Sequence, residues 1–81
     1  MNVSKQRIIS PVEQLRKKKR LGTRRRLAVL TGLSYETLCR YERGLPVKMS
    51  ANVAESLSRV LDIEASWLQQ QYRVWKQFQQ L

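Results

Sequence analysis

The side chains between positions 35 and 40 include several that can read the edges of nucleic acid bases. They supply hydrogen-bond donors and acceptors, an aromatic ring and a thiol: Tyr35, Glu36, Thr37, Cys39 and Arg40. Arginine can donate two hydrogen bonds to guanine, glutamate can accept from the cytosine amino group, and threonine can contact a thymine methyl group. If one helix face carries these residues, they can enter a major groove together. We therefore expect them to contact the bases of double-stranded DNA.

The residues around this face have the spacing that crosses two short helices through one tight turn. Ala28 is small where a second helix must pass closely over the first. Gly32 can adopt a positive φ and so reverse the chain after a helix. Ser34 can cap the next helix, in which Leu38 and Tyr41 turn the opposite face to the core. Residues 23–44 are therefore predicted to form a helix-turn-helix unit.

Positive charge is concentrated in the first third of the chain. The 81 residues carry a net charge of +10, and ten of the sixteen Lys and Arg lie at or before Arg26. A local positive field favours a polyanion and speeds its encounter. We expect phosphate contacts from Arg24, Arg25, Arg26, Ser34, Arg43 and Lys48. The alternative is that these charges only form a solvated surface.

Start and stop signals predict an all-α fold of five helices. Ser10, Pro11 and Glu13 are typical of a helix start, and that helix is expected to run to about Arg20, with Gly22 ending it. The next helices are expected over 24–30 and 35–43, then from Ser50 and from about Glu64. Residues 1–9, with Lys5 and Arg7, are expected to form a flexible basic arm.

The C-terminal segment carries more large apolar side chains than a small core can cover. Two adjoining lines of residues recur at helical spacing: Trp67, Val74, Phe78 and Leu81, with Leu68, Tyr72 and Trp75 beside them. Exposed aromatic surface of this extent typically marks an interface. We therefore expect residues 69–81 to extend the domain as a helix through which two copies form a symmetric dimer. Packing on the first helix of the same subunit and binding to a membrane surface are the alternatives.

From Val12 to Leu68 the chain resembles the Cro and phage-repressor type of helix-turn-helix domain, the XRE family. The resemblance rests on LRKKK, RRLAVLTGLS, YERG and VAESLSRVLDIEASWL. It implies a compact five-helix, repressor-like DNA-binding domain over residues 10–68, and an ion pair between Glu42 and either Arg16 or Lys17. Where the family commonly has a glutamine that donates to a phosphate, this chain has Arg24, which can meet the same phosphate.

Together these features predict a sequence-specific regulator of transcription that binds double-stranded DNA. A homodimer would match a palindromic operator, and repression is the expected outcome, although an activator uses the same contacts. Two alternatives belong to other classes. One is a protein-interaction adaptor or antitoxin-like module in which DNA binding is secondary, and the other is an RNA-binding protein, which the motif favours less because the major groove of A-form RNA is narrow.

Other chemistry has little support in the sequence. There is no histidine, only one cysteine and no phosphate-cradling glycine loop, so no acid–base pair, activated nucleophile, disulfide or Cys/His metal set is indicated. We expect no enzyme activity, no cofactor and no small-molecule ligand. The first thirty residues lack a signal-like apolar run and no segment is long enough to span a bilayer. A cytoplasmic location without membrane contact is therefore expected.

Overall fold

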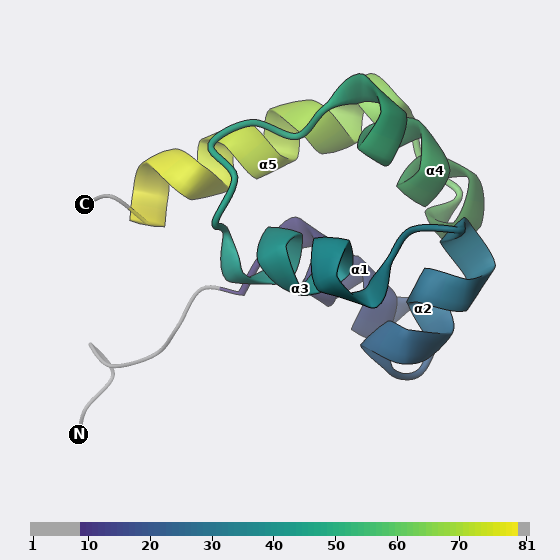
Figure 1. Cartoon of the computed structure of the whole chain (residues 1–81). Helices are drawn as coiled ribbons and strands as arrows, with labels where there is room; N and C mark the ends of the chain where they lie inside the picture. The colour runs from purple at the N-terminus through teal and green to yellow at the C-terminus, as the bar shows by residue number, and fades with distance from the viewer. Residues whose placement is uncertain (1–8, 80–81) are drawn as a thin grey trace.

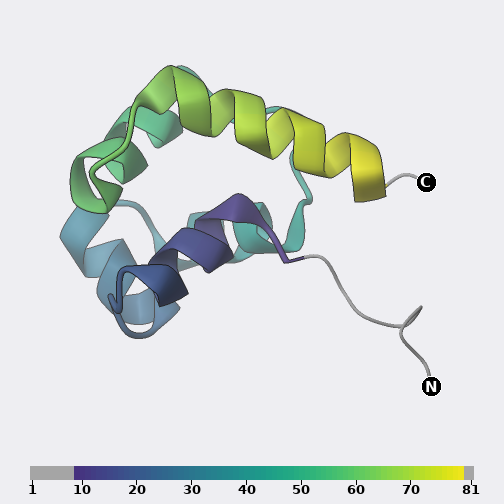
Figure 2. The same cartoon turned by 180° about the vertical axis from the view of Figure 1, so that it is seen from behind.

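The computed structural model describes residues 9–79, which form five α-helices joined by short loops (Figure 1). The helices are α1 (Pro11–Lys18), α2 (Arg24–Thr31), α3 (Tyr35–Arg43), α4 (Ala51–Leu61) and α5 (Ala65–Gln79). α2 packs on α3 and α4, α1 packs on α3 and α5, and α4 packs on α5. α5 crosses the molecule on the side opposite α3, and the view from behind places α1 in front of α3 (Figure 2). The expected all-α fold is confirmed.

Hydroxyl side chains begin the first four helices. Ser10, Thr23, Ser34 and Ser50 each accept a hydrogen bond from the backbone N–H three residues later. This bond satisfies one of the N–H groups that have no partner within the helix. In α1 the cap is combined with Pro11 in the first turn. The helix starts predicted from these residues are therefore confirmed.

Two of the helix ends depend on glycines with positive φ. Gly32 ends α2 at φ 80° and Gly44 ends α3 at φ 79°. At Gly44 a side chain is also excluded by space, because a Cβ atom there would lie 2.7 Å from the Trp75 ring. The tight turn expected at Gly32 is thus confirmed, and Gly44 additionally allows α5 to approach the end of α3.

The first helix is shorter than expected. α1 ends at Lys18, and Arg20 adopts a left-handed conformation with φ 56° although it is not a glycine. The N–H of Leu21 donates to the carbonyl of Arg16 at 3.0 Å, and that of Arg20 donates to Lys17 at 3.1 Å. These two bonds close a Schellman motif. The expectation that α1 continues to Arg20 is therefore wrong, because the chain turns before it reaches Gly22.

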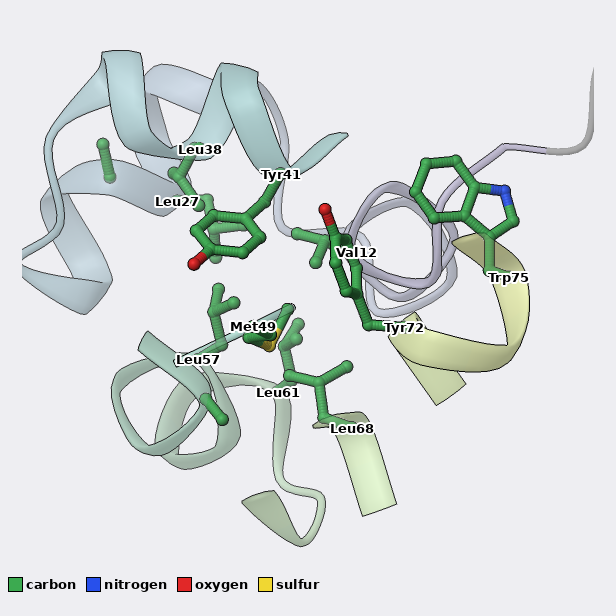
Figure 3. Packing of buried hydrophobic residues seen from close by; sticks show 12 residues of the cluster. Val12, Leu27, Leu38, Tyr41, Met49, Leu57, Leu61, Leu68, Tyr72 and Trp75 are labelled. Carbon is green, nitrogen blue, oxygen red and sulfur yellow. The ribbon is translucent and has the colours of Figure 1, made fainter. Parts of the chain in front are cut away.

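A single apolar core joins all five helices (Figure 3). Its fully buried aliphatic members are Val12, Leu27, Leu38, Ala54, Leu57, Leu61 and Leu68. Tyr72 lies between two other aromatic rings, with its centroid 5.4 Å from that of Tyr41 in an edge-to-face arrangement and 5.6 Å from that of Trp75. Edge-to-face pairs of this kind stabilise a core beyond the area they bury. The core therefore extends along α5 at least as far as Trp75.

This core corrects part of the expected dimer surface. Leu68, Tyr72 and Trp75 are at most 5 % exposed and pack inside their own subunit. Their expected position against a partner is wrong, because they lie on the face of α5 that covers the space between α3, α4 and α1. Trp67, Val74 and Phe78 remain on the surface, with exposed fractions of 44, 37 and 57 %. Leu81 lies outside the described residues.

Leu68→Ala tests this assignment through stability. A buried leucine truncated to alanine loses transfer free energy and leaves a cavity, so we expect the free energy of unfolding to fall by about 2–5 kcal/mol. Denaturant unfolding followed by circular dichroism provides the measurement. Val29→Ala is the matched control. Because Val29 is 81 % exposed in the structure, this substitution is expected to lower the free energy of unfolding only slightly. Equal effects of the two substitutions would contradict the placement of Leu68 in the core.

Candidate nucleic-acid interface

The outward face of α3 carries the polar residues expected to contact bases. Glu36 and Arg40 are exposed and lie four residues apart, so they occupy the same side of the helix. Tyr35 is 41 % exposed at the first turn. Thr37 and Cys39 are half-buried at the two margins of this face. The structure thus brings the five predicted residues to one helix, with three of them exposed and two half-buried.

The opposite side of α3 is fixed by a buried carboxylate. Glu42 is only 1 % exposed and accepts hydrogen bonds from two arginines. Arg16 on α1 donates through Nε at 2.9 Å and through Nη2 at 3.2 Å. Arg24 at the start of α2 donates through Nε at 2.8 Å. One side chain therefore ties α3 to both α1 and α2.

The remaining donors of this ion-pair network are also used. Arg16 Nη1 donates to the carbonyl oxygen of Gly22 at 2.6 Å, and Arg24 Nη1 lies 3.5 Å from the sulfur of Cys39. Contact with Cys39, followed by the charge of Glu42, raises the pKa of Arg24, so this guanidinium stays charged. Within residues 9–79, every buried side-chain nitrogen and oxygen has a hydrogen-bond partner. The ion pair implied for Glu42 is with Arg16, and Lys17 instead pairs with Glu13 at 3.0 Å.

Adjacent arginines at the start of α2 point in different directions. Arg24 turns towards Glu42, whereas the guanidinium carbon of Arg25 lies 4.6 Å from the centre of the Tyr35 ring. Both arginines, with Arg16, Thr23 and Tyr35, line an open hollow of about 390 Å³ between the starts of α2 and α3. Three guanidinium groups and the positive end of α2 make this hollow attractive to an anion.

The loop after α3 is held by side chains of α5, a role that sequence reasoning missed. Tyr72 Oη donates to the carbonyl oxygen of Pro46 at 2.6 Å, and Gln69 Nε2 donates to that of Met49 at 2.9 Å. Lys76 Nζ donates to the carbonyl oxygen of Gly44. Burial, with a smaller contribution from Tyr41, raises the pKa of Tyr72, so its hydroxyl stays a donor. α5 thereby fixes the loop that carries Lys48.

The helices and their sequence pattern match a known family. A family model described as helix-turn-helix, of the Cro/C1 type, matches residues 12–68, which is more than half of the chain. The chain belongs to this helix-turn-helix family. The match confirms the resemblance to XRE-type domains and supports a DNA-binding regulator in general terms. No match was found among curated proteins or among solved structures.

The family match over residues 12–68 covers α1 to α4 and the start of α5. α2 and α3 are the two helices of the motif, and Gly32 lies in the turn between them.

Among the described residues, no three histidine, cysteine or acidic side chains come together in a way that could hold a metal ion. In the same part of the chain, every helix is too short or too polar to cross a bilayer.

Glu42→Ala tests the importance of the buried carboxylate. The substitution leaves Arg16 buried without its counter-ion, so we expect the free energy of unfolding to fall by about 3–5 kcal/mol. The double variant Arg16→Met with Glu42→Leu removes the two buried charges and leaves Arg24, whose side chain is 33 % exposed, so it is expected to recover most of this loss because a well-packed apolar pair can replace a buried ion pair. Denaturant unfolding measures the free energy of unfolding of the unsubstituted chain and of the two variants. Equal stability of Glu42→Ala and the unsubstituted chain would show that the network is unimportant.

Proposed function

We propose that this helix-turn-helix protein is a sequence-specific regulator of transcription that represses by occupying a palindromic operator. The observation that carries the proposal is the division of α3 into two faces. Leu38, Tyr41 and Glu42 fix one face to the domain, while Glu36 and Arg40 leave the other accessible. A helix anchored in this way can enter a major groove without losing its support.

Cations on both sides of α3 support a position along the phosphate backbone. Arg26 lies on α2 before the turn. Arg43 is the last residue of α3, and Lys48 lies in the loop that follows it. All three are exposed. Ser34 is exposed at the cap between the two helices. Arg24 keeps part of its surface accessible beside the anion-attracting hollow. We assign these residues to phosphate contacts, which position the protein without selecting a sequence.

An apolar stripe along α5 supports a homodimer. Trp67, Val74 and Phe78 are exposed and follow one another at intervals of seven and four residues. With Gln71 between them, this spacing gives the continuous seam typical of paired helices. The same side chains, with Leu15 of α1 and others, line a groove of about 320 Å³. A second copy seated here would cover the three exposed side chains at once, and its own α3 would meet the second half of a palindrome.

The same groove favours a second candidate function, that of a protein-interaction adaptor. The groove lies between α1 and α5, whereas α3 lies on the other side of α1 in both views (Figures 1 and 2). A different protein bound in the groove would therefore leave the outward face of α3 free. Sedimentation distinguishes the two, because an adaptor stays monomeric on its own whereas the proposed repressor dimerises.

Arg40→Ala tests sequence reading. Selection of bound duplexes from a random library at near-physiological salt is expected to give the unsubstituted protein a palindromic consensus with half-sites about one helical turn apart. Arg40→Ala is expected to weaken binding to the best site by about 1–3 kcal/mol and to relax the preference at one base pair of each half-site. Arg59→Ala, which removes an exposed charge from α4, is the control. If Arg40→Ala lowers the affinity for every duplex equally, Arg40 does not contact a base.

Val74→Glu tests the dimer. A carboxylate at the middle of the exposed stripe would be buried without a partner, so we expect the protein to become monomeric, and its affinity for the full palindrome to fall towards that for a half-site. Sedimentation equilibrium measures the first effect and fluorescence anisotropy the second. Gln77→Glu adds the same charge to a neighbouring exposed position and is expected to leave the dimer intact. A monomeric unsubstituted protein that still binds the full palindrome tightly would rule out this interface.

A further inference from the structure

Arg25 and Tyr35 form a contact that phosphate binding does not require. The guanidinium carbon of Arg25 lies 4.6 Å from the centre of the Tyr35 ring, which is within the range of a cation–π interaction. Arg25 comes from the first turn of α2 and Tyr35 from the first residue of α3. The contact therefore joins the starts of the two helices of the motif, next to the face that carries Glu36 and Arg40.

The neighbouring arginine shows that this arrangement is specific to Arg25. Arg24 donates to Glu42 and to Cys39, so its guanidinium is part of the network beneath α3. Among the described residues, the guanidinium of Arg25 contacts the Tyr35 ring and makes no hydrogen bond or ion pair. Stacking restricts where this group can lie while its N–H donors stay available for a ligand. Arg25 thus has two properties of a reading residue, a favoured position beside the Tyr35 ring and unused donors.

A guanine can accept from two of these donors at once. A planar guanidinium has parallel donors that match the O6 and N7 acceptors of guanine, and the same group stacks well on an aromatic face. A phosphate can accept the same two bonds, so the place of the guanidinium decides between the two. Since the ring of Tyr35 is itself at the start of the recognition helix, the group that it holds lies at the edge of the major-groove face.

We propose that Arg25 and Tyr35 act as one reading unit, in which the ring of Tyr35 holds the Arg25 guanidinium against a guanine near the edge of each half-site. This inference rests on the proposed function, and it replaces the expectation that Arg25 contacts only phosphate. Arg25 then selects sequence, and Tyr35 is a positioning residue for it. The ring of Tyr35 is needed for this role, whereas its hydroxyl is not.

Two pairs of substitutions separate the reading unit from a phosphate contact. Arg25→Lys keeps the charge but loses the planar fork, whereas Arg26→Lys makes the same change at the next exposed position. Tyr35→Leu removes the ring, whereas Tyr35→Phe removes only the hydroxyl. Thermal unfolding of each variant first shows that the domain is intact.

Binding is then measured by fluorescence anisotropy on the duplex selected by the unsubstituted protein. Each guanine of a half-site is replaced in turn by 7-deazaguanine, which removes the N7 acceptor and keeps base pairing. We expect a position near the edge of the half-site, distinct from any guanine that Arg40 contacts, at which this change weakens the unsubstituted protein about tenfold. At that position Arg25→Lys and Tyr35→Leu are expected to lose sensitivity to the change, whereas Arg26→Lys and Tyr35→Phe keep it.

The outcomes distinguish this inference from the proposed function. If Arg25→Lys responds to every 7-deazaguanine as the unsubstituted protein does, Arg25 is a phosphate contact and the inference is wrong. The inference also fails if Tyr35→Leu keeps the sensitivity, because the ring then does not position the arginine. A protein that selects no sequence from the random library contradicts the proposed function itself, before any variant is compared.

Discussion

The buried carboxylate of Glu42 is the interaction on which the orientation of α3 depends. It accepts hydrogen bonds from Arg16 of α1 and Arg24 of α2 while only 1 % of its surface is exposed. A buried charge is costly unless its partners satisfy it fully, and here both carboxylate oxygens are paired. Because the bonds are directional, they set the rotation of α3 about its own axis, which apolar packing alone specifies less strictly. This rotation decides which residues of α3 face outward. The outward position of Glu36 and Arg40 therefore depends on the ion-pair network of Glu42.

α5 adds a second constraint at the other end of α3. Trp75 packs against Gly44, and hydrogen bonds from Gln69, Tyr72 and Lys76 fix the loop that follows. The helix that carries the exposed stripe of Trp67, Val74 and Phe78 is therefore also the helix that supports the loop bearing Lys48. A contact that moves α5 would therefore also move the end of α3, which physically connects the proposed dimer with the proposed DNA contact.

Local signals explain why much of the fold could be predicted from the sequence. Ser34 and Gly32 act through their own backbone neighbourhood, so the helix starts and the turn were predictable from residue types. The left-handed conformation of Arg20 was not, because it depends on a pair of backbone bonds that closes α1 early rather than on a residue type suited to positive φ.

The candidate site was predictable in its residue types but less so in its pairings. Periodicity showed two adjoining lines of apolar residues on this helix, but not which line faces the core. Tyr72 and Trp75 were therefore assigned to a partner, although the domain buries them itself. Similarly, three consecutive arginines look alike in sequence. Only the position of Glu42 and the ring of Tyr35 in space separate the roles of Arg24 and Arg25.

The most direct test of the central claim, that the outward face of α3 reads DNA, is an NMR titration of the ¹⁵N-labelled protein with its selected duplex. The structure leads us to expect the largest amide shifts in the first turns of α2 and α3 and around Arg40, with smaller shifts for the residues of the α1–α5 groove between the free and the DNA-bound protein. Shifts confined to the groove, with the amides of α3 unaffected, would contradict the claim and place the binding surface elsewhere.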